Sequence, residues 1–474
     1  MRLWDREPTI PLGTQRYLFF LRRMLRITSH QARAHMHVLG KTGSGKSYFL
    51  AGLFLSMYEA GMPATLIDPH GDLAELVLNH LVQRGEFAHR AAYDRLVYLD
   101  LPAAVRAGRY LPFNYLKQPY DDSAMAELVA EACRRAWPEL ATGAPTFENI
   151  LKHSVIVLRQ NRQPLTKLAD LLVDKSFREH LLHQVTDEQV LRFFHHRMDA
   201  WGRDEAHMKE STLNRADLLT LSPVLRHSLG SMDNRLSFRE LIDSGRSLIV
   251  NLALPHHDAR HLFGCLLTVG MESAALARAD NLTNRVPHHL VIDEFSQFMA
   301  QSETALTRML SETRKYGLFC VMAHQNWTQA SERLKGALQN VGIEMILKSG
   351  RMDAEYSARI LGSVDPMQVK HIVEDEKAEE RSHPAYLSLP EQWEEQVQAI
   401  QRLGIGQAFI RLPDDSVHTV KTVTLPQVTV PKDAVNVVRS RYLERYFEPI
   451  GSTAPVQVVP PQIPTITRYP RRVG

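Results

Sequence analysis

The chain has 474 residues, of which 44% are hydrophobic and 23% are charged. This balance is typical of folded globular domains and argues against a disordered or collagen-like chain. The net charge of +3 permits a nucleic-acid partner without requiring one. Three widely spaced cysteines exclude a disulfide framework and indicate buried thiols in a reducing cytoplasm.

The N-terminal segment, residues 1–34, contains a basic amphipathic stretch from Arg16 to Arg26. We expect its apolar face to pack on its own domain, although such a stretch can also touch an anionic membrane surface. No signal peptide is predicted. No uninterrupted run reaches the length of about 18 apolar residues that a membrane span needs. The nearest candidate, Leu262–Ala279, is interrupted by Glu272.

A phosphate-binding loop follows the first predicted strand, Met36–Leu39. Residues 40–47 match the pattern G-x-x-x-x-G-K-[ST], and an apolar helix follows. Glycines let backbone N–H groups turn toward phosphate, Lys46 reaches the β- and γ-phosphates, and the Ser47 hydroxyl holds Mg²⁺. The predicted nucleotide-binding residues are Gly40, Thr42, Gly43, Ser44, Gly45, Lys46, Ser47 and Tyr48.

Short apolar strands alternate with helical patterns along the chain, which predicts an α/β fold with a parallel-rich central sheet and helices on both faces. The predicted strands are Met36–Leu39, Ala64–Ile67, Leu96–Leu99, Leu248–Leu252, His289–Ile292, Leu318–Met322 and Glu344–Leu347. Nearly 150 residues separate the third strand from the fourth and have helical spacing throughout, which is far more than a crossover needs. We therefore predict an all-α insertion at 117–244 within a core formed by 35–116 and 245–425.

The second half of the nucleotide site is predicted at the end of the strand His289–Ile292. Asp293 would hold Mg²⁺ together with Ser47, and Glu294 would act as general base on the attacking water. This Walker B form favours ATP hydrolysis. The Asn-Lys-x-Asp motif of GTPases and the Ser-Gly-Gly-Gln signature of transporter ATPases are absent from the sequence.

Two further residues are candidates for catalysis. Gln325 follows the strand Leu318–Met322 closely, where it could sense the γ-phosphate and position water. Arg314 lies eleven residues earlier, where it could face a neighbouring subunit and stabilise the transition state in trans. Arg351 competes with Arg314 for this role. Adjacent histidines such as His288 and His289 point apart on a strand, so we interpret them as packed or solvated rather than metal-binding.

The C-terminal part begins with a predicted helix, Glu391–Leu403, and a hairpin of Gln407–Leu412 and Val417–Leu425. From residue 426 onward the chain holds eight prolines in 49 residues. Few helix-period apolar patterns occur outside Val435–Phe447, and the composition predicts an extended or disordered tail over 426–474.

Taken together, these motifs resemble the FtsK–HerA superfamily of ring ATPases. The Asp-Pro-His-Gly-Asp-Leu loop at 68–73, Asp293-Glu294-Phe295, Arg-Lys-Tyr-Gly at 314–317 and Ala-His-Gln at 323–325 are most similar to TraG/TraD-type coupling proteins of conjugative and type IV secretion systems. The resemblance covers Arg33 to Pro426. It implies a RecA-like core in a homo-hexamer that translocates DNA, with ATP and Mg²⁺ as cofactors. A relaxase, secretion-channel or nuclease protein is the expected partner.

Such coupling proteins usually begin with transmembrane helices, which are not predicted here. We therefore expect a cytoplasmic protein that reaches the inner membrane face through a partner. Two alternatives remain open. The chain could be an ATP-dependent platform that recruits a protein substrate, in which case DNA would not affect turnover. It could also be the ATPase subunit of a repair or antiviral nuclease complex.

Overall fold

The computed structural model describes residues 7–18, 21–137, 145–280, 285–298, 303–327, 330, 332–338, 340–362, 367, 369–374 and 382–451. Within these residues an eleven-stranded sheet forms the centre of the molecule. Seven of its strands are parallel neighbours, β10 (Ile343–Leu347), β3 (Met36–Leu39), β9 (Leu318–His324), β8 (His288–Ile292), β4 (Ala64–Asp68), β7 (Ser247–Asn251) and β5 (Leu96–Asp100). The predicted α/β class, its parallel-rich sheet and all seven predicted strands are confirmed.

Four antiparallel strands extend the sheet beyond β10. They are β13 (Gln407–Arg411), β14 (Val417–Thr422), β1 (Thr9–Leu18) and β2 (Leu21–Thr28). The predicted hairpin of the C-terminal part is β13–β14. Residues of the N-terminal segment therefore complete the same sheet as the core, because β1 pairs with β14.

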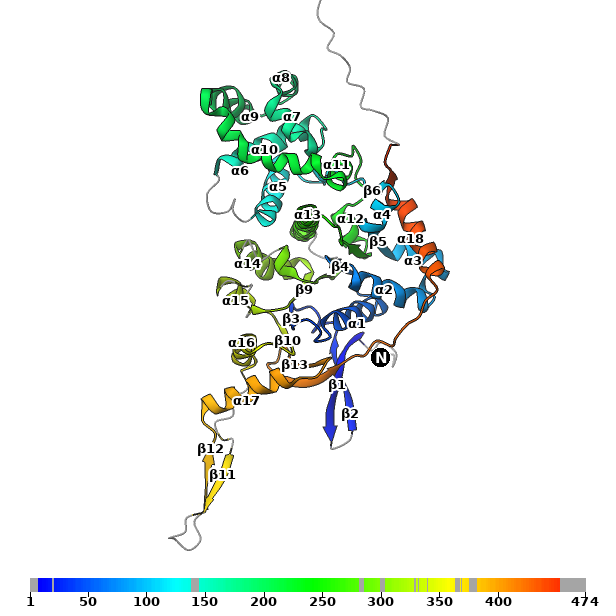
Figure 1. Ribbon diagram of the computed structural model, residues 1–474, viewed down its shortest axis with the longest axis vertical. Helices are drawn as coiled ribbons and strands as arrows, with labels where there is room; N and C mark the ends of the chain where they lie inside the picture. Colours follow the sequence, from blue (N-terminus) through cyan, green and yellow to red (C-terminus); the bar gives the residue numbers. More distant parts are fainter. Residues whose placement is uncertain are drawn as a thin grey trace, which may run out of the picture.

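Helices cover both faces of the sheet, as Figure 1 shows. Alternate strand residues enter two separate hydrophobic clusters, with Val38 in one and Leu39 in the other. The helices of the core are α1 (Lys46–Glu59), α2 (Asp72–Gln83), α3 (Arg90–Arg95), α4 (Leu101–Arg106), α13 (His257–Leu276), α14 (Glu303–Glu312), α15 (Glu332–Leu338), α16 (Arg351–Leu361), α17 (Leu389–Arg402) and α18 (Lys432–Tyr446).

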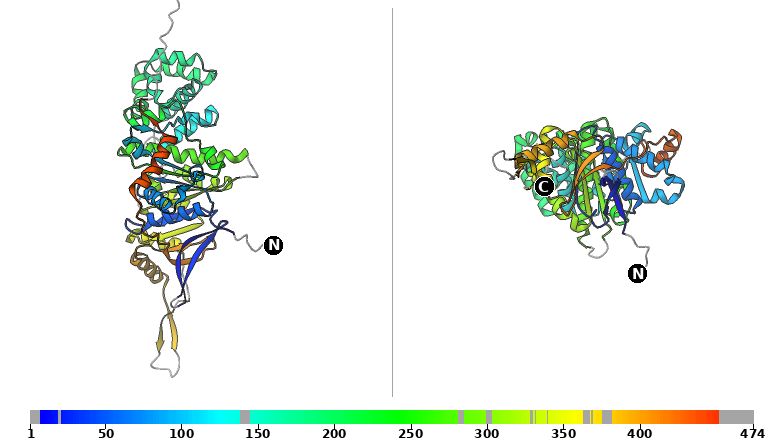
Figure 2. Two further views of the ribbon diagram at one scale, coloured as in Figure 1. Left: turned by 90° about the vertical axis from the view of Figure 1, so that its right-hand side faces the viewer. Right: turned by 90° about the horizontal axis from the view of Figure 1, so that it is seen from below.

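The described residues of 117–244 form mainly helices, most of which gather at one end of the molecule, whereas α12 (Phe238–Asp243) lies beside α13 at the sheet (Figure 1). Their helices are α5 (Asp122–Ala136), α6 (Pro145–Gln160), α7 (Leu168–Val173), α8 (Lys175–Leu182), α9 (Glu188–Arg192), α10 (Glu205–Leu221), α11 (Pro223–Leu229) and α12. The opposite end carries two hairpins, β1–β2 and the separate pair β11 (Val369–Glu374) and β12 (Ser382–Tyr386), as the left view of Figure 2 also shows.

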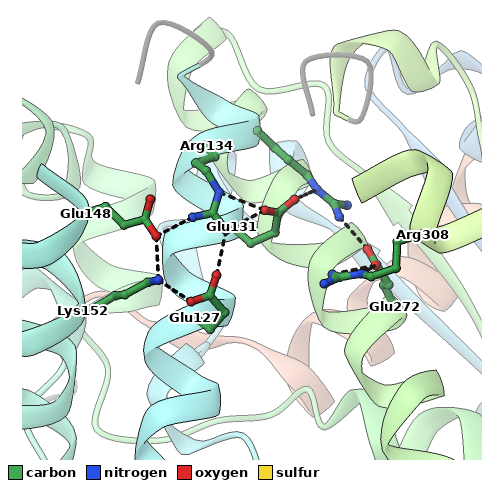
Figure 3. A network of polar contacts seen from close by, with 8 residues as sticks. Glu127, Glu131, Arg134, Glu148, Lys152, Glu272 and Arg308 are labelled. Atoms are coloured by element: carbon green, nitrogen blue, oxygen red, sulfur yellow. Dashed lines mark hydrogen bonds and ion pairs between the residues drawn. The ribbon is translucent and has the colours of Figure 1, made fainter. Parts of the chain in front are cut away.

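Buried ion pairs join this helical insertion to the core. Arg135 on α5 is fully buried and lies 2.8 Å from Glu131 of its own helix and 2.5 Å from Glu272 on α13. Glu272 also accepts a hydrogen bond from Arg308 on α14 at 3.0 Å. Figure 3 shows this network continuing to Glu148 and Lys152 on α6. Charged contacts thus connect the insertion to the helix that follows the Walker B segment.

The helix α13 is a core helix by its surroundings. α13 belongs to the helical stretch His257–Asp280. Among the described residues, this one stretch has the length and mean hydropathy (1.3) of a membrane span, and 83% of its most apolar 18 residues are buried inside the protein. Length and composition alone are weak evidence for a membrane span. Buried Glu272, held between Arg135 and Arg308, agrees with packing inside the protein.

The prediction of an extended or disordered tail from residue 426 onward is wrong for residues 432–446, which form α18. Val435, Val438 and Tyr442 are buried at helical spacing, and the Tyr442 hydroxyl donates to the carbonyl of Leu96 on β5. Helix packing against the edge strand therefore outweighs the proline-rich composition. The remainder of the predicted tail, 452–474, lies outside the described residues.

Histidines buried in the central strands should make the fold sensitive to acid. Burial lowers the pKa of His37 and His288 to about 3, and that of His289 to about 4, from 6.5. The folded state therefore binds fewer protons than the unfolded state below pH 6.5, so stability is greatest above 6.5 and falls toward pH 4. Each such histidine adds up to about 1.4 kcal/mol per pH unit to the fall.

We expect the midpoint of urea denaturation to decrease as the pH falls from 6.5 to 4. Carboxylates whose pKa is lowered in the folded protein, such as Glu131 and Asp243, contribute to the same trend, whereas the raised pKa of Glu344 opposes it. The informative comparison is therefore with His289→Gln, which should show a shallower decrease. Equal slopes in the two proteins would contradict the assignment to the buried histidine.

Candidate functional site

The P-loop is held by backbone hydrogen bonds to the ends of the two strands beside β3. The N–H of Gly40 donates to the carbonyl of His324 at 3.2 Å, and the N–H of Lys41 donates to that of Lys348 at 3.1 Å. Gly43 and Gly45 have φ of 77° and 96°, the left-handed conformation that glycine adopts without strain. The loop therefore has the curvature that was predicted from its glycines.

A second loop supports the P-loop from the C-terminal hairpin. The N–H of Gly406 donates to the carbonyl of Ser44 at 2.9 Å. A Cβ added to Gly45 would lie 3.0 Å from the nitrogen of Gly406, so glycine is needed here for close approach as well as for its φ. The sequence motif alone contains no sign of this contact, which joins residues more than 350 positions apart.

The two Walker B carboxylates meet the P-loop lysine at the end of β8. Lys46 Nζ lies 3.2 Å from Asp293 Oδ1 and also contacts Glu294 Oε1. All three side chains are buried. Burial raises the pKa of Asp293, and the positive charge of Lys46 opposes that rise. The predicted lysine and carboxylates are thus assembled in one place by the parallel sheet.

Gln325 connects the P-loop to the second carboxylate. Its Nε2 donates to Glu294 Oε1 at 3.0 Å, and its Oε1 accepts a hydrogen bond from Thr42 Oγ1 at 2.9 Å. Glu294 itself has a φ of 53°, a left-handed conformation that costs a non-glycine residue about 1–3 kcal/mol. Such strain is common where a side chain must be aimed at a reacting group.

These residues line a cleft of about 370 Å³. Its walls are formed by Lys41, Thr42, Gly43, Gly45, Lys46, Ser47, Tyr48, Asp68, His70, Asp72, Leu73, Asp293, Glu294 and Gln325. Gly40 and Ser44 are buried in the loop beneath it. Asp68 stabilises the loop between β4 and α2, because its carboxylate accepts hydrogen bonds from the N–H groups of His70 and Ala74.

The two arginine candidates lie at opposite edges of the sheet. Arg314 is exposed on a turn just before β9, at the amino edge, away from the cleft of its own chain. Arg351 begins α16 at the carboxyl edge, where Glu394 holds it with two hydrogen bonds of 2.7 Å. The structure does not bring Arg314 to the other predicted site residues, so its role in trans stays a prediction.

A buried polar chain beneath the P-loop was not predicted. His37 Nδ1 lies 2.5 Å from Glu344 Oε1, and His37 Nε2 lies 2.7 Å from His324 Nε2. An Nε2–Nε2 contact needs a proton on one of the two nitrogens, so the two tautomers are coupled. When Glu344 accepts from His37, His324 must donate to His37; when Glu344 is protonated, the direction reverses.

The polar chain of His37, His324 and Glu344 lies directly behind the part of the cleft that holds Glu294 and Gln325. His324 precedes Gln325 in the sequence, and Phe295, which follows Glu294, packs 5.2 Å from the His324 ring. Trp327 packs against both histidines. Burial raises the pKa of Glu344 well above its ordinary value. The sequence signal for the chain was a polar residue within each of two otherwise apolar strands.

Comparisons with known proteins agree with this architecture. Residues 24–424 match the family model described as the type IV secretion-system coupling protein DNA-binding domain. The unbound conjugative coupling protein TrwBdeltaN70 has a TM-score of 0.53 at 17% identity, over 86% of this chain and 89% of that chain. VirB4 of Thermoanaerobacter pseudethanolicus has a TM-score of 0.53 at 14% identity, over 88% of this chain and 96% of that chain.

A third solved structure is TrwB in complex with ADP and Mg²⁺. It has a TM-score of 0.50 at 18% identity and covers 86% of this chain and 89% of that chain. At these identities the likeness shows a shared fold. A comparison with curated proteins found no match.

Proposed function

This chain belongs to the family of type IV secretion-system coupling protein DNA-binding domains, and from that premise we propose that it is an ATPase that translocates DNA. The proposal rests on one observation: Lys46, Glu294 and Gln325 converge in a single cleft that the P-loop lines. A DNA-binding domain that only held DNA would not need a carboxylate beside the P-loop lysine.

Each residue of the cleft has a chemical role in this proposal. The P-loop N–H groups and Lys46 would hold the phosphates, and Ser47 with Asp293 would hold Mg²⁺. The left-handed glycines of the loop and the carboxylate beside Lys46 suit these ligands. Mg²⁺ supplies neutralisation of phosphate charge when bound. Glu294 would take the proton of the attacking water, and Gln325 would orient that water.

We propose a ring of six identical subunits, as the resemblance to ring ATPases implies. Arg314 lies just before β9 at the amino edge of the sheet, so in this proposal it would act on the nucleotide of a neighbouring subunit. The segment 252–260, which follows β7 and includes the exposed His256 and the exposed first residue of α13, His257, is a candidate pore loop. In this proposal the partner protein is a relaxase, a secretion-channel protein or a nuclease. Phosphate contacts in a pore give binding that ignores sequence and weakens with salt.

The test is steady-state ATP hydrolysis with single-stranded DNA, with double-stranded DNA and without DNA. We expect stimulation by one DNA form, and loss of all turnover in Lys46→Ala. Turnover that is equal in all three conditions would overturn the translocase proposal and favour ATP-dependent recruitment of a protein. A variant with unchanged turnover would show that another enzyme in the preparation hydrolyses ATP.

A further inference from the structure

The β1–β2 hairpin is a basic arm at one end of the molecule. Its residues, 9–28, contain four arginines, Arg16, Arg22, Arg23 and Arg26, and no aspartate, glutamate or lysine. Figures 1 and 2 show the hairpin directed away from the helical insertion. Any surface that the hairpin touches therefore lies at the end of the molecule opposite to the insertion.

The hairpin has two parts with different surroundings. At its base, Ile10, Leu12, Leu25 and Ile27 are buried against the core. Within the predicted amphipathic stretch from Arg16 to Arg26, Leu25 therefore packs on its own domain as expected, whereas Leu21 does not. Toward its end, Arg16, Leu21 and Arg22 are exposed, and the Leu21 side chain is 55% exposed. The packed base holds the exposed end in place.

The exposed end places like charges together. Arg16 and Arg22 are direct cross-strand partners, an arrangement that is unfavourable in a free sheet. Within the part of the chain that the structure describes, neither arginine has an ion-pair partner. The nearest acid in the sequence, Glu7, already accepts hydrogen bonds from the Ser29 hydroxyl and the His30 N–H. An external anion would relieve the repulsion.

We propose that the end of this hairpin docks directly on an anionic lipid bilayer. Arg16 and Arg22 would contact lipid phosphates, and Leu21 would enter the boundary between headgroups and acyl chains. Charge alone would also suit DNA. The exposed leucine beside the arginines favours a bilayer over DNA, because the boundary between headgroups and acyl chains can bury an apolar side chain whereas a phosphate backbone cannot. This inference concerns a surface distinct from the nucleotide cleft and does not depend on ATP hydrolysis.

The test is co-sedimentation of the full-length protein with vesicles of phosphatidylcholine, with and without phosphatidylglycerol. Binding should require phosphatidylglycerol. The double variant Arg16→Ser/Arg22→Ser should bind about 30-fold more weakly, since each basic residue near an anionic surface contributes about fivefold. Leu21→Ser should also weaken binding, with the charge unchanged.

A matched control distinguishes the effect of the hairpin arginines from the effect of a lower net charge. Arg90→Ser/Arg106→Ser removes two exposed arginines from α3 and α4, which lie outside the hairpin, and should bind vesicles like the original protein. Circular dichroism and thermal unfolding would show that each variant is folded. Equal vesicle binding by the hairpin variant and its control would overturn the proposal. So would hairpin variants that lose DNA affinity while vesicle binding stays unchanged.

Discussion

Glu294→Gln should reduce ATP turnover by about 10²–10⁴-fold, the usual contribution of a positioned general base. Gln325 could still hydrogen-bond the new amide, so the geometry of the cleft should change little. Affinity for ATP should be retained or increased, because the substitution removes a negative charge from the neighbourhood of Lys46. The two quantities are measured separately, by phosphate release and by equilibrium binding of a fluorescent ATP analogue.

Lys46→Ala is the control for this experiment, since it should lose binding and turnover together. A Glu294→Gln variant with turnover near the original value would contradict the base assignment and direct attention to Asp293. Loss of ATP binding in Glu294→Gln would instead mean that the carboxylate mainly keeps Lys46 in place.

Arg135→Met should lower the free energy of unfolding by about 3–5 kcal/mol, because it removes the fully buried counter-charge of two buried carboxylates. Glu131 would keep only Arg134, and Glu272 only Arg308, and both of these arginines are partly exposed. Glu131 and Glu272 both contact Arg135, which is itself fully buried. The measurement is urea denaturation followed by tryptophan fluorescence. The transition to follow is the one that reports the insertion, because a chain of this size need not unfold in one step.

Arg308→Met is the matched control, because Arg308 binds the same Glu272 but its side chain is 47% exposed. An exposed pair contributes about 0–1 kcal/mol, so this variant should be much less destabilised. Adding Glu272→Gln to Arg135→Met should recover part of the loss. Equal effects of the two arginine substitutions would show that burial does not decide the energetics of this network.

Much of the core was predictable because its strands are short, continuous apolar runs. β3, β4 and β8 are buried at every position, so periodicity was not needed to find them. The P-loop and the Walker B carboxylates follow such strands directly in the sequence. Since parallel strands place their carboxyl ends along one edge, the convergence of Lys46, Asp293 and Glu294 could also be predicted.

Other parts depend on contacts between distant segments, which one sequence does not show. His37 and Glu344 are 307 positions apart, and their pairing follows from the position of β10 beside β3. The N-terminal hairpin was recognised only as basic and amphipathic, because its strand character comes from pairing with β14. In α18 the local signal was present, but the proline count around it was given more weight.

The order of strands in the sheet has a consequence for how the chain is synthesised. β3 is flanked by β9 and β10, so the P-loop strand has no neighbour until residue 324 has left the ribosome and lacks its second neighbour until residue 347 has done so. The final hairpin then closes the sheet over β1, through pairs such as Gly13 with Thr422. Contacts between residues so far apart in the sequence are slow to form, and the apolar helix α1 stays exposed until the sheet against which it packs has formed. We therefore expect the nascent chain to depend on chaperones, and the residues that line the cleft to be complete only once Gln325 has been added.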